Sequence, residues 1–241
     1  MKSYVHHLER LAAGPWPETP REPDFRSREW LPESRDALML DVGCGLGKRM
    51  AELHHWGYHR LVGVDVNPDV VAAARTRLPE DVELVCAGAT EFLAAGARKY
   101  DRVVIAHVLE HMNVEEAVAM LGAVRASLTA DGRVVVEVPN MTCLTAAHMF
   151  HSDVTHRQGY TEYSLTQVFE ESGFGDVCLI CPRPPLELQR WRPWRPFMGT
   201  TIGWRTNVLL HRLAYRITDM GPRARCFCPH LLMTASPAKE S

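Results

Sequence analysis

The sequence predicts an α/β fold built on a doubly wound parallel β-sheet. From Ala37 onwards, short apolar runs alternate with helical stretches that have their own start signals, which is the pattern of strands joined by crossover helices. The chain has 241 residues, of which 46% are hydrophobic and 23% charged. This composition is ordinary for a globular protein, and the length is sufficient for one such domain with a sizeable core.

Before the alternation begins, residues 1–36 hold a short helical start and then a run rich in proline and tryptophan. Proline resists both the interior of a helix and a central strand. We therefore predict an N-terminal arm over residues 1–36, which lies over the domain or over its substrate. The domain itself is expected to span residues 37–241.

Seven strands are expected in chain order. They cover residues 37–43, 61–65, 82–86, 101–106, 132–138, 177–181 and 230–235. Three helices between them have clear start signals. Asn67 precedes Pro68 as an N-cap, and Asn113 caps the long helix after the fourth strand. Ser164 and Gln167 have the spacing of a capping box at the start of a later helix.

The first strand ends in alternating glycines, Gly43, Gly45 and Gly47. Such a turn lets the backbone approach a ligand closely, and the helix over 48–56 presents its N-terminal amides to that ligand. A dinucleotide site requires the third glycine one residue later. Asp65 ends the second strand, where its carboxylate can accept hydrogen bonds from both ribose hydroxyls, although this alone does not distinguish NAD from an adenosyl group.

Together these features resemble the class I S-adenosylmethionine-dependent methyltransferases, whose first motif is an acidic residue followed by x-G-x-G-x-G. The resemblance extends over roughly residues 37–180. Five segments carry it, in the order and with the spacing of the family: 40–47, 63–71, 86–93, 100–112 and 131–140. It implies a Rossmann-like, seven-stranded methyltransferase sheet and S-adenosyl-L-methionine as the cofactor.

The resemblance also assigns positions to the cofactor. Asp41 and the backbone over 43–47 would receive the methionine moiety, and Asp65 the ribose. Ala89 and Thr90 would lie beside the adenine. The full set of cofactor positions is Asp41, Gly43, Gly45, Gly47, Asp65, Val66, Ala89, Thr90 and His107. A glycine turn that serves only packing is the alternative, which the later motifs disfavour.

The segment A-H-V-L-E-H-M contains H-x-x-E-H, the motif of one class of zinc proteases. That motif must be helical, so that both imidazoles face one way. Here His107 directly follows the strand over 101–106, so the five residues straddle a strand-to-helix turn. We therefore predict no metal site, and we place His107 and His111 at the carboxyl end of the sheet, where open α/β sheets bind ligands.

A second segment, over 151–165, resembles the D-x-T-H…(Y/F)-T-x-x-S-L pattern that many methyltransferases have between the fifth strand and the next helix. Some of these belong to glycan and secondary-metabolite pathways. The resemblance places His151, Asp153, His156 and Tyr160 over the mouth of the site. Alternatively, Asp153 and His156 only hold this loop together through hydrogen bonds, an interpretation that applies most to Asp153 and Thr155.

Methyl transfer is an in-line displacement, and a hydroxyl acceptor must also lose its proton. Histidine is the natural base because it titrates near neutral pH. His111 and His156 are our candidate catalytic residues, with His151 behind them. If the acceptor were an amine or a carbon, these histidines would only position it.

Residues 183–228 are an expected helical insertion before the last strand, rich in arginine and tryptophan. Between Arg183 and Arg225, nine arginines stand against two acids, so this stretch has a formal charge of +7. A helix here would align Arg205, Arg212 and Arg216 on one stripe, opposite Leu210, Ala214 and Ile217. Such a stripe suits phosphate or sugar-phosphate recognition, or peripheral contact with anionic lipid through 203–217. Alternatively, the arginines pair with the acidic remainder of the domain.

Seven unevenly spaced cysteines do not suggest a disulfide framework. Cys178 and Cys181 would point to opposite faces of a strand, so we expect no zinc site there with Cys226, Cys228 and His230. The net charge of −2 gives no general attraction to nucleic acid. No apolar run reaches about 18 residues, so we expect a soluble, cytoplasmic protein.

The leading hypothesis is therefore an S-adenosylmethionine-dependent methyltransferase that acts on an oxygen of a small molecule or glycan. The second hypothesis is a catalytically silent protein of the same fold that binds a partner through the arginine-rich insertion. An NAD-dependent oxidoreductase comes third, because the glycine spacing disfavours it. The sequence predicts no oligomeric state.

Overall fold

The computed structural model describes residues 23, 28–180, 201–218 and 224–238. Its strands form one seven-stranded sheet in the order β3-β2-β1-β4-β5-β7-β6. The strands are β1 Met39–Val42, β2 Leu61–Asp65, β3 Glu83–Cys86, β4 Tyr100–Ala106, β5 Leu128–Pro139, β6 Phe174–Leu179 and β7 His230–Pro237. All seven predicted strands are confirmed, as is the order reversal that defines a doubly wound sheet.

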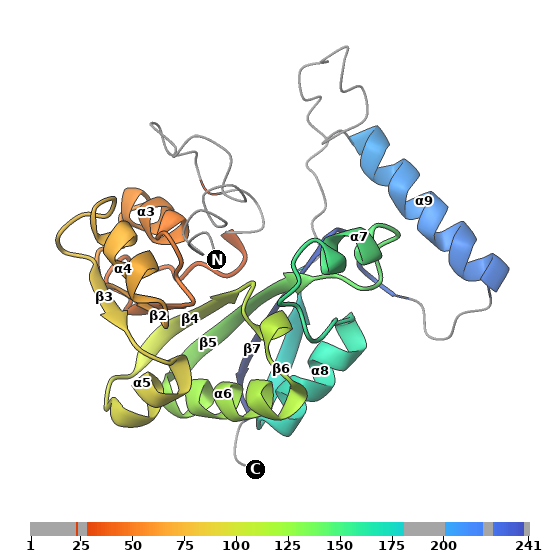
Figure 1. Ribbon diagram of the computed structural model, residues 1–241. Helices are drawn as coiled ribbons and strands as arrows, with labels where there is room; N and C mark the ends of the chain where they lie inside the picture. The colour runs from red at the N-terminus through yellow and green to blue at the C-terminus, as the bar shows by residue number, and fades with distance from the viewer. Residues whose placement is uncertain (1–22, 24–27, 181–200, 219–223, 239–241) are drawn as a thin grey trace.

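Helices cover both faces of this sheet. They are α3 Lys48–His55, α4 Pro68–Arg75, α5 Ala89–Ala95, α6 Val114–Ser127, α7 Ala146–His151, α8 Glu162–Glu171 and α9 Thr201–Thr218, with a short 3-10 helix η1 Leu109–His111. Helices α5, α6 and α8 line one face, and α3 and α4 lie over the other (Figure 1). The central strands are therefore buried on both sides: Val103 and Ile105 of β4 belong to the first core, and Val104 between them belongs to the second.

The last strand runs against the prediction of a parallel sheet. β7 pairs antiparallel with both β5 and β6, with Val134 opposite Ala235 and Pro139 opposite His230. The sheet is therefore mixed, because the apolar pattern of a strand does not encode the direction of its pairing. The reversal brings the beginning of β7 to the edge of the sheet where the parallel strands end.

Two of the three predicted helix starts are confirmed. The side chain of Asn67 accepts hydrogen bonds at the start of α4, and Asn113 forms a capping box with Glu116 at the start of α6. The prediction for α8 was wrong by three residues, because Thr161 is the N-cap and Ser164 closes its capping box. Both residues have a hydroxyl suited to a cap, and the earlier one starts the helix.

The described end of the predicted arm packs onto the domain. Trp30 is buried in the core on the α3 side of the sheet, and the Tyr58 hydroxyl donates a hydrogen bond to the Pro32 carbonyl. Most of the arm, residues 1–22 and 24–27, lies outside the described residues. Its predicted position over the substrate is therefore still a prediction.

Helix α9 lies between β6 and β7 in the chain, beyond α7 (Figure 1). His211 of this helix is buried, and its Nε2 atom accepts a hydrogen bond from the Leu144 amide at 2.8 Å. The predicted apolar stripe does not face the domain, since Leu210 and Ile217 are exposed. The exposed apolar residues of the helix are Leu209, Leu210, Leu213 and Ile217.

The charged stripe of α9 is described only in part. Arg212 and Arg216 are exposed, and no ion pair joins either to another described residue. Arg225, beyond the helix, pairs with the buried carboxylate of Glu162. The side chain of Arg205 and residues 181–200, with their tryptophans, lie outside the described residues. The predicted membrane contact through 203–217 stays a prediction, and no described helix combines the length and apolar character needed to cross a membrane.

Candidate functional site

The glycine turn after β1 adopts a conformation that favours glycine throughout. Gly43, Gly45 and Gly47 have φ angles of +68°, +54° and +83°. A Cβ atom on Gly43 would lie 2.5 Å from Val108, whereas one on Gly45 would meet only a carbonyl oxygen at 4.0 Å. Gly45 is thus the point at which a ligand can approach the backbone closely.

Asp65, at the end of β2, is tied to this turn by its carboxylate. Its Oδ2 atom accepts a hydrogen bond from the Gly45 amide at 3.1 Å, and Oδ1 accepts one from the Asn67 amide at 2.9 Å. A carboxylate oxygen has two lone pairs, so each oxygen can accept one more hydrogen bond, for example from a ribose. Val66 follows with 73% of its surface exposed, an apolar side chain beside a polar anchor.

The predicted adenine positions lie at the neighbouring strand. Ala89 and Thr90 begin α5, directly after β3, and the Ala87 amide donates to the Asp65 carbonyl at 3.1 Å. The structure thus brings the turn, Asp65 and the start of α5 to adjacent strand ends. Their binding of a cofactor is still a prediction.

Three charged side chains occupy the other side of the turn. Asp41 is only 5% exposed, and burial raises its pKa to about 6, although Arg49 opposes the shift. Arg49 of α3 pairs with Glu137 of β5 at 3.1 Å. Neither Arg49 nor Glu137 was among the residues predicted for the site. The position of Arg49 in the first turn after the glycines was the signal available for it.

His107, the residue after β4, has the left-handed conformation, with φ +57°. Such strain in a residue other than glycine is often found at functional sites. Its Nδ1 atom donates to Oε1 of Glu110 at 3.0 Å, and its ring contacts that of His230. Burial lowers the pKa of His107, but the hydrogen bond and charge of Glu110, together with Glu137, outweigh this, so the net pKa is raised.

His111 is held by a chain of two hydrogen bonds. The Thr155 hydroxyl donates its proton to Oδ1 of Asp153 at 2.6 Å. The oxygen of that hydroxyl, Oγ1, lies 2.8 Å from Nδ1 of His111. Because a hydroxyl has only one proton, its oxygen must accept from Nδ1–H of His111. The proton of the neutral ring is therefore on Nδ1, and Nε2 carries the lone pair.

The neutral ring of His156 has the same tautomer for a different reason. Its Nδ1 atom lies 2.8 Å from the Phe150 carbonyl oxygen, which can only accept, so the lone pair is again on Nε2. The rings of His111 and His156 lie 4.8 Å apart. Glu110 is fully buried beside them, and its Oε2 atom has no hydrogen-bond partner within the described part of the chain.

Two other predicted residues of this loop do not join the pair. His151 ends α7 as an exposed side chain whose ring contacts Phe150. Tyr160 was expected over the mouth of the site, but it is 1% exposed, and its hydroxyl donates to the Leu109 carbonyl. The prediction for Tyr160 was wrong, because a large aromatic residue at the start of a helix more readily fills the core.

The reversed last strand contributes to this edge as well. Asn140, fully buried after β5, donates to the carbonyls of Cys226 and Cys228, which holds the end of the insertion against the site. Cys178 is exposed on β6, and Cys181 lies outside the described residues. Among the described residues, no group of three metal-ligating side chains includes a cysteine.

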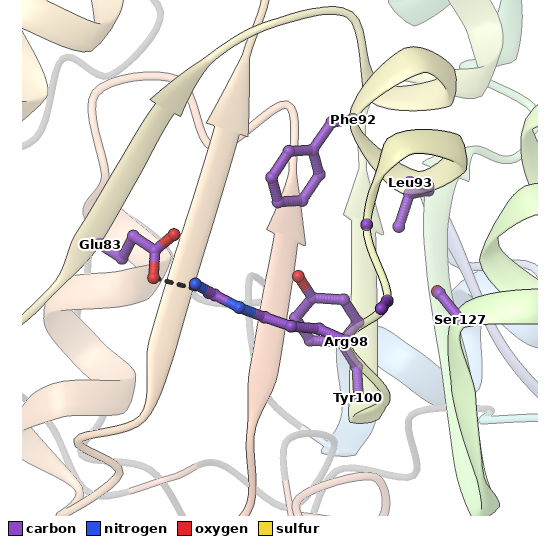
Figure 2. Close-up of a pocket in the computed structure, with 8 residues that line it drawn as sticks. Glu83, Phe92, Leu93, Arg98, Tyr100 and Ser127 are labelled. Atoms are coloured by element: carbon purple, nitrogen blue, oxygen red, sulfur yellow. Dashed lines mark hydrogen bonds and ion pairs between the residues drawn. The ribbon is translucent and has the colours of Figure 1, made fainter.

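A pocket at the opposite edge of the sheet can be separated from this site. Figure 2 shows it near the beginnings of β3 and β4, where Arg98 pairs with Glu83 at 2.6 Å. It is lined by Glu83, Phe92, Leu93, Gly96, Ala97, Arg98, Tyr100 and Ser127. Open α/β sheets bind their ligands at the carboxyl ends of the strands, so we assign this pocket no part in the candidate site.

Comparison with known proteins gives these residues a context. Residues 39–132 match the model of a family described as a methyltransferase domain. A curated relative is the trans-aconitate 2-methyltransferase of Escherichia fergusonii, which is 39% identical over 51 residues. That match spans 21% of this chain and only 20% of the relative.

Solved structures extend the comparison to nearly the whole chain. A SAM-dependent methyltransferase from Archaeoglobus fulgidus has a TM-score of 0.66 and 22% identity, covering 97% of this chain and 99% of that one. Human N-acetylserotonin methyltransferase, solved in complex with SAM, has a TM-score of 0.62 and 14% identity, covering 98% of this chain and 55% of that one. At these identities the likeness concerns the fold.

Proposed function

Through residues 39–132 the chain belongs to the class I S-adenosylmethionine-dependent methyltransferases, and from this premise we propose that it methylates a hydroxyl oxygen of a small molecule or glycan. The observation that carries the proposal is the pair of unprotonated Nε2 atoms on His111 and His156, at the carboxyl edge of the sheet. A hydroxyl donor finds acceptors there. An ammonium acceptor would have to lose its proton first.

The residues around the glycine turn and Asp65, at the cofactor end of the candidate site, fit S-adenosylmethionine. The open space at Gly45, the remaining lone pairs of Asp65 and the exposed Val66 suit a nucleoside. Asp41 and Arg49 offer opposite charges for the ammonium and carboxylate groups of the methionine moiety. When bound, this cofactor supplies a methyl group attached to a sulfonium sulfur. The rest of the cofactor is the leaving group, and its sulfur becomes a neutral thioether.

The protein's part in the reaction is alignment and proton removal. The bond from sulfur to the methyl carbon breaks as the bond from the acceptor oxygen to that carbon forms, and the hydroxyl proton must leave. The histidine pair receives the hydrogen bond of that hydroxyl and guides the proton to solvent. Thr155 and Asp153 keep His111 in the tautomer that can do so.

The similar proteins support a small acceptor. Trans-aconitate and N-acetylserotonin, after which two of them are named, are small molecules. The NAD-dependent oxidoreductase of the sequence analysis has no support, because the matched family is a methyltransferase domain. A catalytically silent protein would transfer no labelled methyl group to any acceptor, so an activity assay distinguishes this alternative.

The test is a panel of phenols, catechols, sugars, carboxylic acids and amines, incubated with the protein and labelled S-adenosylmethionine, with mass spectrometry of the products. We expect oxygen-linked methyl groups, and we expect His111→Ala to lower kcat about 100-fold while it changes cofactor affinity less than about twofold. His148→Ala, an exposed histidine of α7, is the matched control. Methylation only of nitrogen, or full activity of His111→Ala, would contradict the proposal.

A further inference from the structure

We infer that Glu110, His111 and His156 form a binding site for a divalent transition-metal ion at the acceptor end. One ligand atom from each residue lies within 4.8 Å of the other two. The binding of the ion does not depend on the proposed function, but its catalytic consequence rests on it. The earlier expectation of no metal concerned His107 and His111 as helical neighbours, and did not consider His156 from the later loop.

The protonation states are the first argument. Both Nδ1 atoms are engaged in hydrogen bonds, to the Thr155 hydroxyl and to the Phe150 carbonyl. Two Nε2 lone pairs are therefore left at a cluster whose third member is a carboxylate. Because both Nδ1 protons are used in these hydrogen bonds, the atoms that the neutral rings and the carboxylate can still offer are acceptors. A cation is the group that such a set binds.

The buried carboxylate is the second, independent argument. Glu110 is fully buried, and its side chain has one described partner, His107 at Oε1, while Oε2 has none. Burying a carboxylate whose oxygens are only partly hydrogen-bonded is costly. A cation beside Glu110 supplies the missing partner.

The surroundings of the three ligands follow the pattern of metal sites. Metal-binding histidines usually donate their second nitrogen to a carboxylate, carbonyl or other oxygen, which fixes the ring. His111 does so through Thr155, and His156 through the Phe150 carbonyl. Donor atoms about 2.1 Å from one ion are about 3–3.5 Å apart, so binding would draw this cluster together by rotation of the side chains.

The ligand set indicates the ion and its use. Two imidazoles and one carboxylate suit Zn²⁺ or Mn²⁺, and three protein ligands leave a position open. An ion held there would bind the acceptor hydroxyl and lower its pKa, so that the proton leaves to solvent. His111 would then be a ligand rather than the base, and acceptors with two neighbouring oxygens would bind best.

Two other groups could bind the same probes. His54, His59 and Asp81 form an exposed group, and the other consists of His107, Glu137 and His230. The substitution His59→Ala removes one ligand of the first group. Every measurement is therefore made on protein that carries this substitution, which is called the background. The other is tested by His230→Ala.

The experiment is calorimetric titration of the chelator-treated protein with ZnSO₄ and with MnCl₂, together with metal analysis after desalting. We expect one ion per chain, a loss of affinity of at least about 100-fold in His156→Ala and in Glu110→Gln, and a loss of 10- to 100-fold in Thr155→Val. His148→Ala should bind as the background does. Cofactor affinity, measured on the same samples, should stay within about twofold and shows that each variant is folded.

The inference is wrong if neither ion binds, if His156→Ala binds normally, or if His230→Ala rather than His156→Ala removes binding. Its failure can be distinguished from that of the proposed function. Oxygen methylation by a protein that binds neither ion rejects the metal site alone, and oxygen methylation that persists in chelator rejects only the catalytic use of a bound ion. Tight binding of the ion with no methylated acceptor rejects the proposed function alone.

Discussion

The two ends of the candidate site are built by different means. At the cofactor end, the carboxylate of Asp65 accepts hydrogen bonds from the backbone amides of Gly45 in the glycine turn and of Asn67. At the acceptor end, His111 and His156 come from separate segments and meet through side chains, with Thr155 and Phe150 as supports. The first end depends on backbone conformation, and the second on the placement of side chains.

This difference has a consequence for substitution. A site made of backbone amides tolerates few changes at its glycines and at Asp65, but it is insensitive to most side chains around it. A site made of side chains on a loop can change its ligand by single substitutions. Variants of the two ends should therefore separate into those that lose the cofactor and those that lose only turnover.

The largest effect is expected from Asp65→Ala. It removes the acceptors proposed for the ribose and leaves the Gly45 and Asn67 amides without their partner. We expect the affinity for S-adenosylmethionine to fall about 1000-fold, or about 4 kcal/mol, by calorimetry. Asp69→Ala, on the exposed side of α4, is the control. Retained affinity would show that the ribose does not bind at Asp65.

Asp41→Asn should stabilise the unliganded protein. A buried carboxyl with its pKa raised from 3.8 to about 6 is destabilising when ionised, above pH 6, and this cost shrinks as the pH falls towards 3.8. The gain should reach about 3 kcal/mol at pH 8 and about half of that at pH 5, by urea unfolding. A gain independent of pH would contradict burial of the charge as its cause. The same variant should bind the cofactor more weakly.

Gly43→Ala tests whether the two ends are separate. Its Cβ atom would lie 2.5 Å from Val108, which sits between the cofactor turn and η1. We expect a loss of about 2 kcal/mol in stability, from the positive φ angle and the collision together. Because Val108→Ala removes the collision, the double variant should lose less than the sum of the single variants. Simple additivity would show that the turn and the acceptor segment are not coupled through this contact.

The smallest effect is expected for Thr155→Val, measured as a decrease in kcat. It removes the hydrogen bond that orients His111, without touching the cofactor end. A loss of one such bond corresponds to about 1 kcal/mol, or about fivefold in kcat. Steady-state kinetics with the identified acceptor would measure it. A change in cofactor KM instead would place Thr155 at the wrong end of the site.

The sequence predicted the local geometry of the glycine turn better than the contacts between distant side chains, for a physical reason. The glycine turn, Asp65 and the caps at Asn67 and Asn113 are set by local conformation, so their signals lie within a few residues. The pairing of His111 with His156 depends on how a distant loop folds over η1, which no local pattern records. Glu110 was overlooked because its burial is visible only in three dimensions.

Errors in the fold arose in the same way. The antiparallel entry of β7 is decided by tertiary packing, which the apolar pattern of one strand does not record. The start of α8 was missed by one turn, because Thr161 and Ser164 are both good capping residues and only one can be first.

The pairing of β6 with β7 has a practical meaning for engineering. Leu179 lies opposite Met233, and the Ile180 amide donates to the Leu232 carbonyl, so the chain leaves the sheet and returns to it at neighbouring positions. A short hairpin could therefore replace the intervening stretch at a low cost in closure entropy. The connection between these two strands is in effect an exchangeable cassette, because its two ends lie at neighbouring positions of the sheet.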